Sequence, residues 1–262
     1  MADHQCGGCG GCGGGHAEPQ EPQKTQLNPL SKVKKIIGVV SGKGGTGKSL
    51  VTGLLATGLQ RRSLSTAILD ADISCPAIPL ILDLPQGVTR GEAGLYPAIS
   101  ELGLRVMSIS LLMESESELI TTRGASMAAI VEQLFSSVIW DDAEYLFLDL
   151  PSGLGDVIQL AFERLPLDGL LLVTTPGELV SHAIRRTILL AQSLHVPILG
   201  LVENFSESFG GTGTETIRQE FDLPILDRLP LDPRLSMAAD SGKLELLETS
   251  YLSNTIQLLE SL

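Results

Sequence analysis

The chain has 262 residues and a net charge of −13, and 43% of its residues are apolar and 19% charged. This supply of apolar side chains suits a sizeable folded core, whereas the negative charge disfavours duplex nucleic acid and anionic membranes as partners, because both bind basic surfaces. The sequence has no apolar run near the roughly 20 residues of a membrane span and no apolar signal sequence at its start. We therefore expect a cytoplasmic protein that binds neither nucleic acid nor membranes.

The N-terminal region differs in composition from the rest of the chain. It contains CGGCGGCGGGH followed by AEPQEPQ, which offers almost no apolar surface to bury. We predict a flexible Cys- and Gly-rich tail over residues 1–31. No repeat or linker divides the remainder, so residues 32–262 are predicted to form a single domain.

Apolar strand-like runs alternate with segments of helical periodicity from residue 34 onward. Strands are predicted at 34–40, 66–72, 144–150, 168–176, 196–204 and 223–230, with a hairpin or short strands at 94–99 and 104–110. Helices are predicted at 48–62, 124–138, 178–194, 214–221, 233–241 and 249–261. The alternation predicts an α/β fold with a doubly wound, mainly parallel sheet that helices cover on both faces. In such a sheet, ligands bind beyond the carboxyl ends of the strands.

The segment GKGGTGKS, residues 42–49, fits the phosphate-binding pattern G-x-x-x-x-G-K-[ST]. It lies between a predicted strand and a predicted helix, which is the context that such a loop requires. The glycines let backbone N–H groups turn toward phosphate oxygens, and the start of the helix adds its positive dipole end. Lys48 is expected to contact the β- and γ-phosphates of ATP, and the Ser49 hydroxyl to bind Mg²⁺. The sequence thus predicts a P-loop NTPase.

Carboxylates stand at the ends of two further predicted strands. Asp149 closes one apolar strand, and Asp70 and Asp72 lie two residues apart on the same side of another strand end. One acid of this pair could orient or deprotonate the attacking water. Asp149 and the other acid are suited to the coordination shell of Mg²⁺, because this ion prefers carboxylate oxygens and phosphates.

Several motifs, in order along the chain, make it resemble a known family. Besides the glycine-rich loop they are ILDADISCPAIP, LFLDLPSGLGD, TTPGELV, PILGLVENF and LPLDPRLSMAADSGK. They resemble the Mrp-type (ApbC-like) ATPases, a family of iron–sulfur cluster carriers related to MinD, ParA and the nitrogenase iron protein. The resemblance runs from about Val33 to the end of the chain. It implies Mg²⁺-dependent ATP hydrolysis, a nucleotide-dependent homodimer and client or scaffold proteins of metal-cofactor assembly.

The resemblance also assigns roles to individual residues. Lys43, a second lysine inside the glycine run, matches the early lysine of the deviant Walker A loop, which crosses the dimer interface to the partner's nucleotide. A cation at that place would offset charge that develops during phosphoryl transfer. We therefore expect Lys43, Lys48 and Asp72 to be catalytic, with Asp72 orienting the water and Asn204 contacting adenine. The residues expected to bind ATP are Gly42, Gly44, Gly45, Thr46, Gly47, Lys48, Ser49, Leu50 and Asn204.

Three cysteines of the predicted tail have metal-binding spacing. Cys6, Cys9 and Cys12 form two overlapping C-x-x-C pairs, and such pairs chelate one metal ion or two corners of a cluster. Family members that hold clusters carry a C-x-x-C pair shortly after the VEN motif, and this chain has no cysteine there. We expect the tail to hold an iron–sulfur cluster or another metal, and the preference for iron and sulfur rests on the resemblance. Cys75 is expected to be a buried or loop-lining thiol.

Three functions follow from these features. The first is an ATPase that binds, assembles or transfers an iron–sulfur cluster to client proteins. The alternatives are a MinD- or ParA-like regulatory switch without metal and a maturation ATPase that inserts nickel or another cofactor. The net charge and the C-terminal YLSNTIQLLESL, which lacks lysine and arginine, disfavour the DNA- and membrane-binding forms of such a switch.

Overall fold

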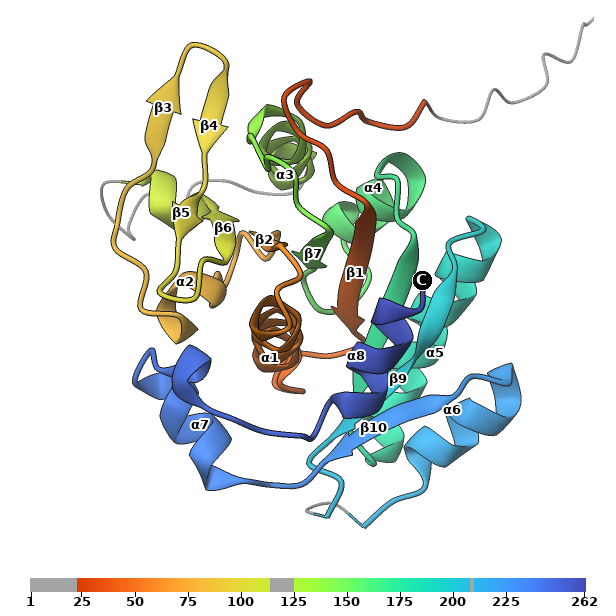
Figure 1. Ribbon diagram of the computed structural model, residues 1–262. Helices are drawn as coiled ribbons and strands as arrows, with labels where there is room; N and C mark the ends of the chain where they lie inside the picture. The colour runs from red at the N-terminus through yellow and green to blue at the C-terminus, as the bar shows by residue number, and fades with distance from the viewer. Residues whose placement is uncertain (1–22, 114–124, 208–209) are drawn as a thin grey trace, which may run out of the picture.

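A computed structural model describes residues 23–113, 125–207 and 210–262 of the chain (Figure 1). The main sheet contains β1 (Lys35–Ser41), β2 (Thr66–Asp70), β5 (Ala98–Ile99), β6 (Arg105–Ser108), β7 (Tyr145–Asp149), β8 (Gly169–Thr174), β9 (Ile198–Asn204) and β10 (Ile225–Leu229). A separate hairpin pairs β3 (Thr89–Gly91) with β4 (Gly94–Tyr96). The helices are α1 (Lys48–Arg61), α2 (Ile78–Ile81), α3 (Ala125–Ser137), α4 (Asp156–Arg164), α5 (Glu178–Ser193), α6 (Gly213–Phe221), α7 (Pro233–Asp240) and α8 (Ser253–Glu260). Two 3₁₀ turns cover Ile109–Leu112 and Leu244–Leu246.

The strand order of the main sheet is β10-β9-β8-β1-β7-β2-β6-β5. Its neighbouring strands run parallel, except that β5 pairs antiparallel with β6. The chain starts in the middle of the sheet and winds outward in both directions. This arrangement confirms the predicted doubly wound, mainly parallel α/β fold, and it places the carboxyl ends of β1, β2 and β7 side by side.

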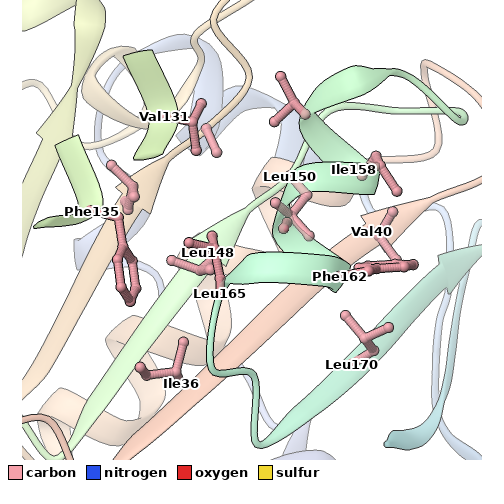
Figure 2. Packing of buried hydrophobic residues seen from close by; sticks show 14 of the residues in the cluster. Ile36, Val40, Val131, Phe135, Leu148, Leu150, Ile158, Phe162, Leu165 and Leu170 are labelled. Carbon is pink, nitrogen blue, oxygen red and sulfur yellow. The ribbon is translucent and has the colours of Figure 1, made fainter. Parts of the chain in front are cut away.

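The two faces of the sheet carry two separate hydrophobic clusters, and β1 contributes to both because successive side chains of a strand point to opposite faces. Ile36 and Val40 pack on the side of α3, α4, α5 and α6. Figure 2 shows them in the same cluster as residues of α3 and α4. Ile37 and Val39 pack on the other side, against α1, α2, α7 and α8. β1 is therefore buried on both faces, which fixes the position of the loop that follows it.

The sequence analysis places most elements within a few residues of their observed bounds and differs from the structure in the elements that it misses and in the segment 94–99. It predicts neither α4 nor the short α2 and β3. Residues 94–99 are divided, because β4 pairs with β3 whereas β5 pairs with β6. The sequence leaves open a hairpin or short strands at 94–99 and 104–110; the antiparallel pairing of β5 with β6 fits the first, and the separate short strand β4 fits the second.

The last part of the predicted tail that the structure describes lies on the body of the protein. Lys24 Nζ donates hydrogen bonds to the backbone oxygens of Phe162 and Leu165, both at 3.3 Å, and the backbone N–H of Thr25 donates to Arg164 at 2.7 Å. These contacts lie where α4 ends and β8 is about to begin, at the edge of the sheet opposite the carboxyl ends (Figure 1). The division at residue 31 stays a prediction, and Cys6, Cys9 and Cys12 lie outside the described residues.

Candidate functional site

The glycine-rich loop connects the end of β1 to the start of α1, as the sequence predicts. Gly47 has φ of 80°, a left-handed conformation that glycine adopts most readily. A side chain at this position would also overlap the amide nitrogen of Asn204. Gly42 lies so close to α5 that a Cβ would overlap the backbone of Ile184. Glycine is therefore required at both positions by close packing on two sides of the loop.

Lys48 and Asp149 form a buried ion pair at the base of this loop. Lys48 Nζ lies 2.7 Å from Asp149 Oδ2, and the two side chains are 7% and 0% exposed. The Ser49 hydroxyl donates to the same carboxylate oxygen at 2.6 Å, and the Thr52 hydroxyl donates to Oδ1 at 2.7 Å. Both carboxylate oxygens are thus hydrogen-bonded, which a buried charge requires.

Asp70 lies beside Asp149, since the two residues are direct partners in the pairing of β2 with β7. Its carboxyl group is completely buried and accepts hydrogen bonds from the backbone N–H groups of Asp72 and Ile78, both at 3.2 Å. Burial and the negative charge of Asp149 raise the pKa of Asp70 to about 8, although the nearby Lys48 lowers it in part. Asp70 therefore keeps a proton more readily than an exposed aspartate does.

Asp72 lies in the loop after β2 and is partly exposed. Its Oδ1 accepts hydrogen bonds from the Ser74 hydroxyl at 2.9 Å and from the backbone N–H of Cys75 at 3.3 Å. Asp72 and Cys75 line a cavity of about 450 Å³ that residues 44–50 also line. Cys75 is exposed, so it is a loop-lining thiol rather than a buried one, and it faces the same cavity as the phosphate-binding loop.

Asn204 ends β9 and lies behind the glycine-rich loop. It is completely buried, its Nδ2 donates to the backbone oxygen of Thr46 at 3.0 Å, and its Oδ1 accepts from the backbone N–H of Phe205 at 3.0 Å. Phe205 has φ of 57°, which is uncommon for a residue with a side chain. Asn204 therefore ties the loop to the sheet, and its expected contact with adenine stays a prediction.

Lys43 lies on the exposed outer side of the loop. Exposed leucines follow the two strands beside β1 at the same edge of the sheet, one in the loop after β7 and one in the first turn of α5. Leu154 follows β7 and is 47% exposed, and Leu179 follows β8 and is 69% exposed. The exposed lysine is therefore flanked by apolar side chains that the sequence analysis does not single out.

The donors in this site suit Mg²⁺ bound together with a nucleotide. Ser49 and Asp149 bring a hydroxyl and a carboxylate into contact beneath the loop, and Mg²⁺ in such sites takes few protein ligands because phosphates and water supply the rest. Within residues 23–113, 125–207 and 210–262, no cluster of three or more His, Cys, Asp or Glu side chains could hold a metal by itself. No helix in these ranges is long and apolar enough to cross a membrane.

The fold and the loop define a P-loop NTPase of the ParA type. The sequence model of the ParA family described as NUBPL iron-transfer P-loop NTPase matches residues 32–261. The chain belongs to this family, and it is an ATPase.

Individual similar proteins agree with this placement. The iron–sulfur cluster carrier protein of Clostridium perfringens is 32% identical over 226 residues, which cover 79% of this chain and 80% of the relative. A Trichoplax adhaerens protein named cytosolic Fe-S cluster assembly factor NUBP2 homolog is 34% identical over 78% of this chain and 84% of its own length. Among solved structures, a nucleotide-binding protein from Archaeoglobus fulgidus in complex with ADP has a TM-score of 0.71 at 30% identity, and the match covers 84% of this chain and 90% of that one.

Proposed function

We propose that this chain is a homodimeric, Mg²⁺-dependent ATPase that binds an iron–sulfur cluster and transfers it to client proteins. The observation that carries the proposal is a loop of the phosphate-binding pattern, with Lys48 and Ser49 both bonded to Asp149, in a chain of the iron-transfer family. The names of the Clostridium and Trichoplax relatives point to the same cargo. Both alternatives that the sequence leaves open, a metal-free switch and a nickel-insertion ATPase, are distinguished by the experiment below.

ATP binds with its phosphates in the loop formed by residues 42–49. ATP also contacts Leu50 and the side of the loop on which Asn204 lies. Lys48 exchanges its ion pair with Asp149 for the β- and γ-phosphates. Ser49, Asp149 and the ionised form of Asp70 would hold Mg²⁺, and the ion would supply positive charge that neutralises the phosphates. Asp72 orients the attacking water in the same cavity.

The homodimer forms through the surface at the carboxyl ends of the strands, where Lys43 lies. The lysine is exposed and flanked by Leu154 and Leu179, so a second copy of this surface covers the apolar side chains and brings the lysine to the partner's nucleotide. Lys43→Ala should therefore lower ATP-dependent dimerisation and turnover without changing the fold. Sedimentation with and without a slowly hydrolysed ATP analogue measures the first effect. A variant that dimerises and hydrolyses ATP like the wild type would exclude this role.

Cys6, Cys9 and Cys12 are proposed as ligands of the cargo. Lys24 and Thr25 fasten the chain to the body at the edge of the sheet opposite the glycine-rich loop, so the cysteine segment joins the domain away from the nucleotide. We propose that residues 1–31 carry the cluster and that residues 32–262 bind ATP. The net charge of −13 and the name of the Trichoplax relative favour a cytoplasmic protein without nucleic acid or membrane partners.

Anaerobic reconstitution with iron and sulfide tests the cargo. The wild type should take up both elements and develop the absorption of a cluster, whereas the triple variant Cys6→Ser, Cys9→Ser, Cys12→Ser should not. Cys75→Ser is the matched control, because it removes the remaining cysteine of the chain and leaves the tail intact. Equal iron and sulfide in the triple variant would contradict the proposal. In a parallel assay that offers nickel in place of iron, uptake of nickel by a wild type that takes up no iron would favour the cofactor-insertion ATPase, and uptake of neither metal would favour the metal-free switch.

A further inference from the structure

Thr52 is a buried hydroxyl beneath the phosphate-binding loop. It lies one helical turn after Lys48 on α1 and is 0% exposed. Its Oγ1 is 2.7 Å from Asp149 Oδ1 and 3.1 Å from the backbone oxygen of Lys48. A hydroxyl proton serves one acceptor at a time, and the carboxylate is both nearer and charged, so it is the stronger acceptor.

The two oxygens of Asp149 have different partners. Oδ2 accepts from Lys48 and Ser49, two residues that also line the cavity, whereas Oδ1 accepts from Thr52. A carboxylate rotates easily about its terminal bond, because that torsion has only broad minima. The bond from Thr52 to one oxygen therefore limits rotation of the carboxylate and keeps the other oxygen directed at Ser49, and it does not need to change when Lys48 moves to a phosphate.

We infer that Thr52 positions the carboxylate of Asp149 for Mg²⁺ and so sets the Mg²⁺ affinity of the nucleotide site. This inference rests on the proposed function, in which Ser49 and Asp149 hold the ion. Thr52 is a positioning residue, because its side chain is not among those that line the nucleotide cavity. Partners of metal ligands act in this way in other proteins, where their loss lowers metal affinity about 10- to 100-fold.

Thr52→Val tests the inference, since valine keeps the branched shape and removes the hydroxyl. Thr52→Ser is the rescue variant, because it keeps the hydroxyl and loses a methyl group. Thr57→Val is the matched control: Thr57 is on the same helix, is 2% exposed, and its hydroxyl has no hydrogen-bond partner within the described chain. All three variants are compared with the wild type by circular dichroism before binding is measured.

The readout is binding of a fluorescent ADP, measured in EDTA and then over a series of Mg²⁺ concentrations. Thr52→Val should bind ADP like the wild type in EDTA and need about tenfold more Mg²⁺ for half of the Mg²⁺-induced change. Thr52→Ser and Thr57→Val should keep the wild-type midpoint. If Thr52→Val is poorly folded, Thr52→Ala replaces it in the same comparison with Thr52→Ser.

Two results would overturn the inference. An unchanged Mg²⁺ midpoint in the variants that lack the hydroxyl means that Thr52 does not position the metal ligand. An equal loss of ADP affinity with and without Mg²⁺ means that Thr52 supports the loop as a whole. Failure of the proposed function would give a different result from these two. In that case the wild type itself would bind ADP without any effect of Mg²⁺.

Discussion

Replacing Gly47 by alanine probes the contact between the phosphate-binding loop and Asn204. Gly45 and Gly47 both have φ of 80°, so alanine at either position is held in the left-handed region. This conformation costs about 1 to 2 kcal/mol for a residue with a Cβ. The new Cβ of Gly45→Ala has nothing within 4 Å, whereas that of Gly47→Ala overlaps the Asn204 amide. Gly45→Ala is therefore the matched control for backbone strain.

The second effect at Gly47 comes from the hydrogen bond between Asn204 and Thr46. Asn204 is completely buried, and a displaced amide leaves a buried polar group without its partner, which costs about 1 to 3 kcal/mol. We therefore expect Gly47→Ala to lower the free energy of unfolding by about 2 to 5 kcal/mol and Gly45→Ala by about 1 to 2 kcal/mol. Urea unfolding without nucleotide measures both values.

A double-mutant cycle identifies the cause of the difference. In an Asn204→Ala background the amide is absent, so the effect of Gly47→Ala should fall to that of Gly45→Ala. Equal losses in the two glycine variants, or a loss at Gly47 that Asn204→Ala does not reduce, would refute the reasoning.

Three further predictions concern side chains around the cavity. In the folded protein the pKa of Asp70 is raised from 3.8 to about 8. Between these two pH values the folded state binds more protons than the unfolded state, so the contribution of Asp70 to stability falls as pH rises. Asp70→Asn removes that dependence. The free energy of unfolding of the variant minus that of the wild type should therefore increase between about pH 5 and pH 8, measured by urea titration without nucleotide. A difference that stays constant with pH would contradict the stated cause. Asp149→Ala leaves the Lys48 ammonium buried and unpaired, and should lower the free energy of unfolding by about 3 to 5 kcal/mol. Asp142→Ala is the control, because it removes an exposed ion pair and should lower the free energy of unfolding by less than about 1 kcal/mol. Similar losses in these two variants would show that the buried pair is not the cause. Mg²⁺ and ADP together should slow the alkylation of Cys75 by a maleimide, measured by peptide mass spectrometry, because the thiol lines the cavity that the nucleotide fills; labelling at an unchanged rate would place the nucleotide elsewhere.

The parts of the molecule that are local in sequence could be predicted from it. The glycine-rich loop is one example, because the strand, the turn and the start of the helix are consecutive. The acids at the ends of β2 and β7 are another, since parallel strands bring their carboxyl ends to one edge of the sheet. The sequence analysis does not predict α4, because a nine-residue element directly after GLG resembles a continuing loop. Its buried residues do have helical spacing, namely Val157, Ile158, Ala161 and Phe162.

Other features depend on packing between distant segments. The bond from Asn204 to Thr46 joins residues 158 positions apart, and nothing in either local sequence indicates it. Thr52 is similar, because a threonine among the apolar residues of α1 has no pattern that marks its bond to Asp149. The pairing of β4 with β3 depends on the turn between them, which a search for apolar runs does not detect.

Cluster transfer under the control of ATP tests the central claim most directly. The reconstituted wild type, the Lys48→Ala variant and the triple cysteine variant are each mixed with an apo-ferredoxin as acceptor, with and without Mg²⁺ and ATP. We predict that ATP changes the rate of transfer from the wild type and leaves the rate from Lys48→Ala unchanged, while the triple cysteine variant transfers no cluster. A wild-type rate that is the same with and without ATP would contradict the account, as would transfer from the triple cysteine variant.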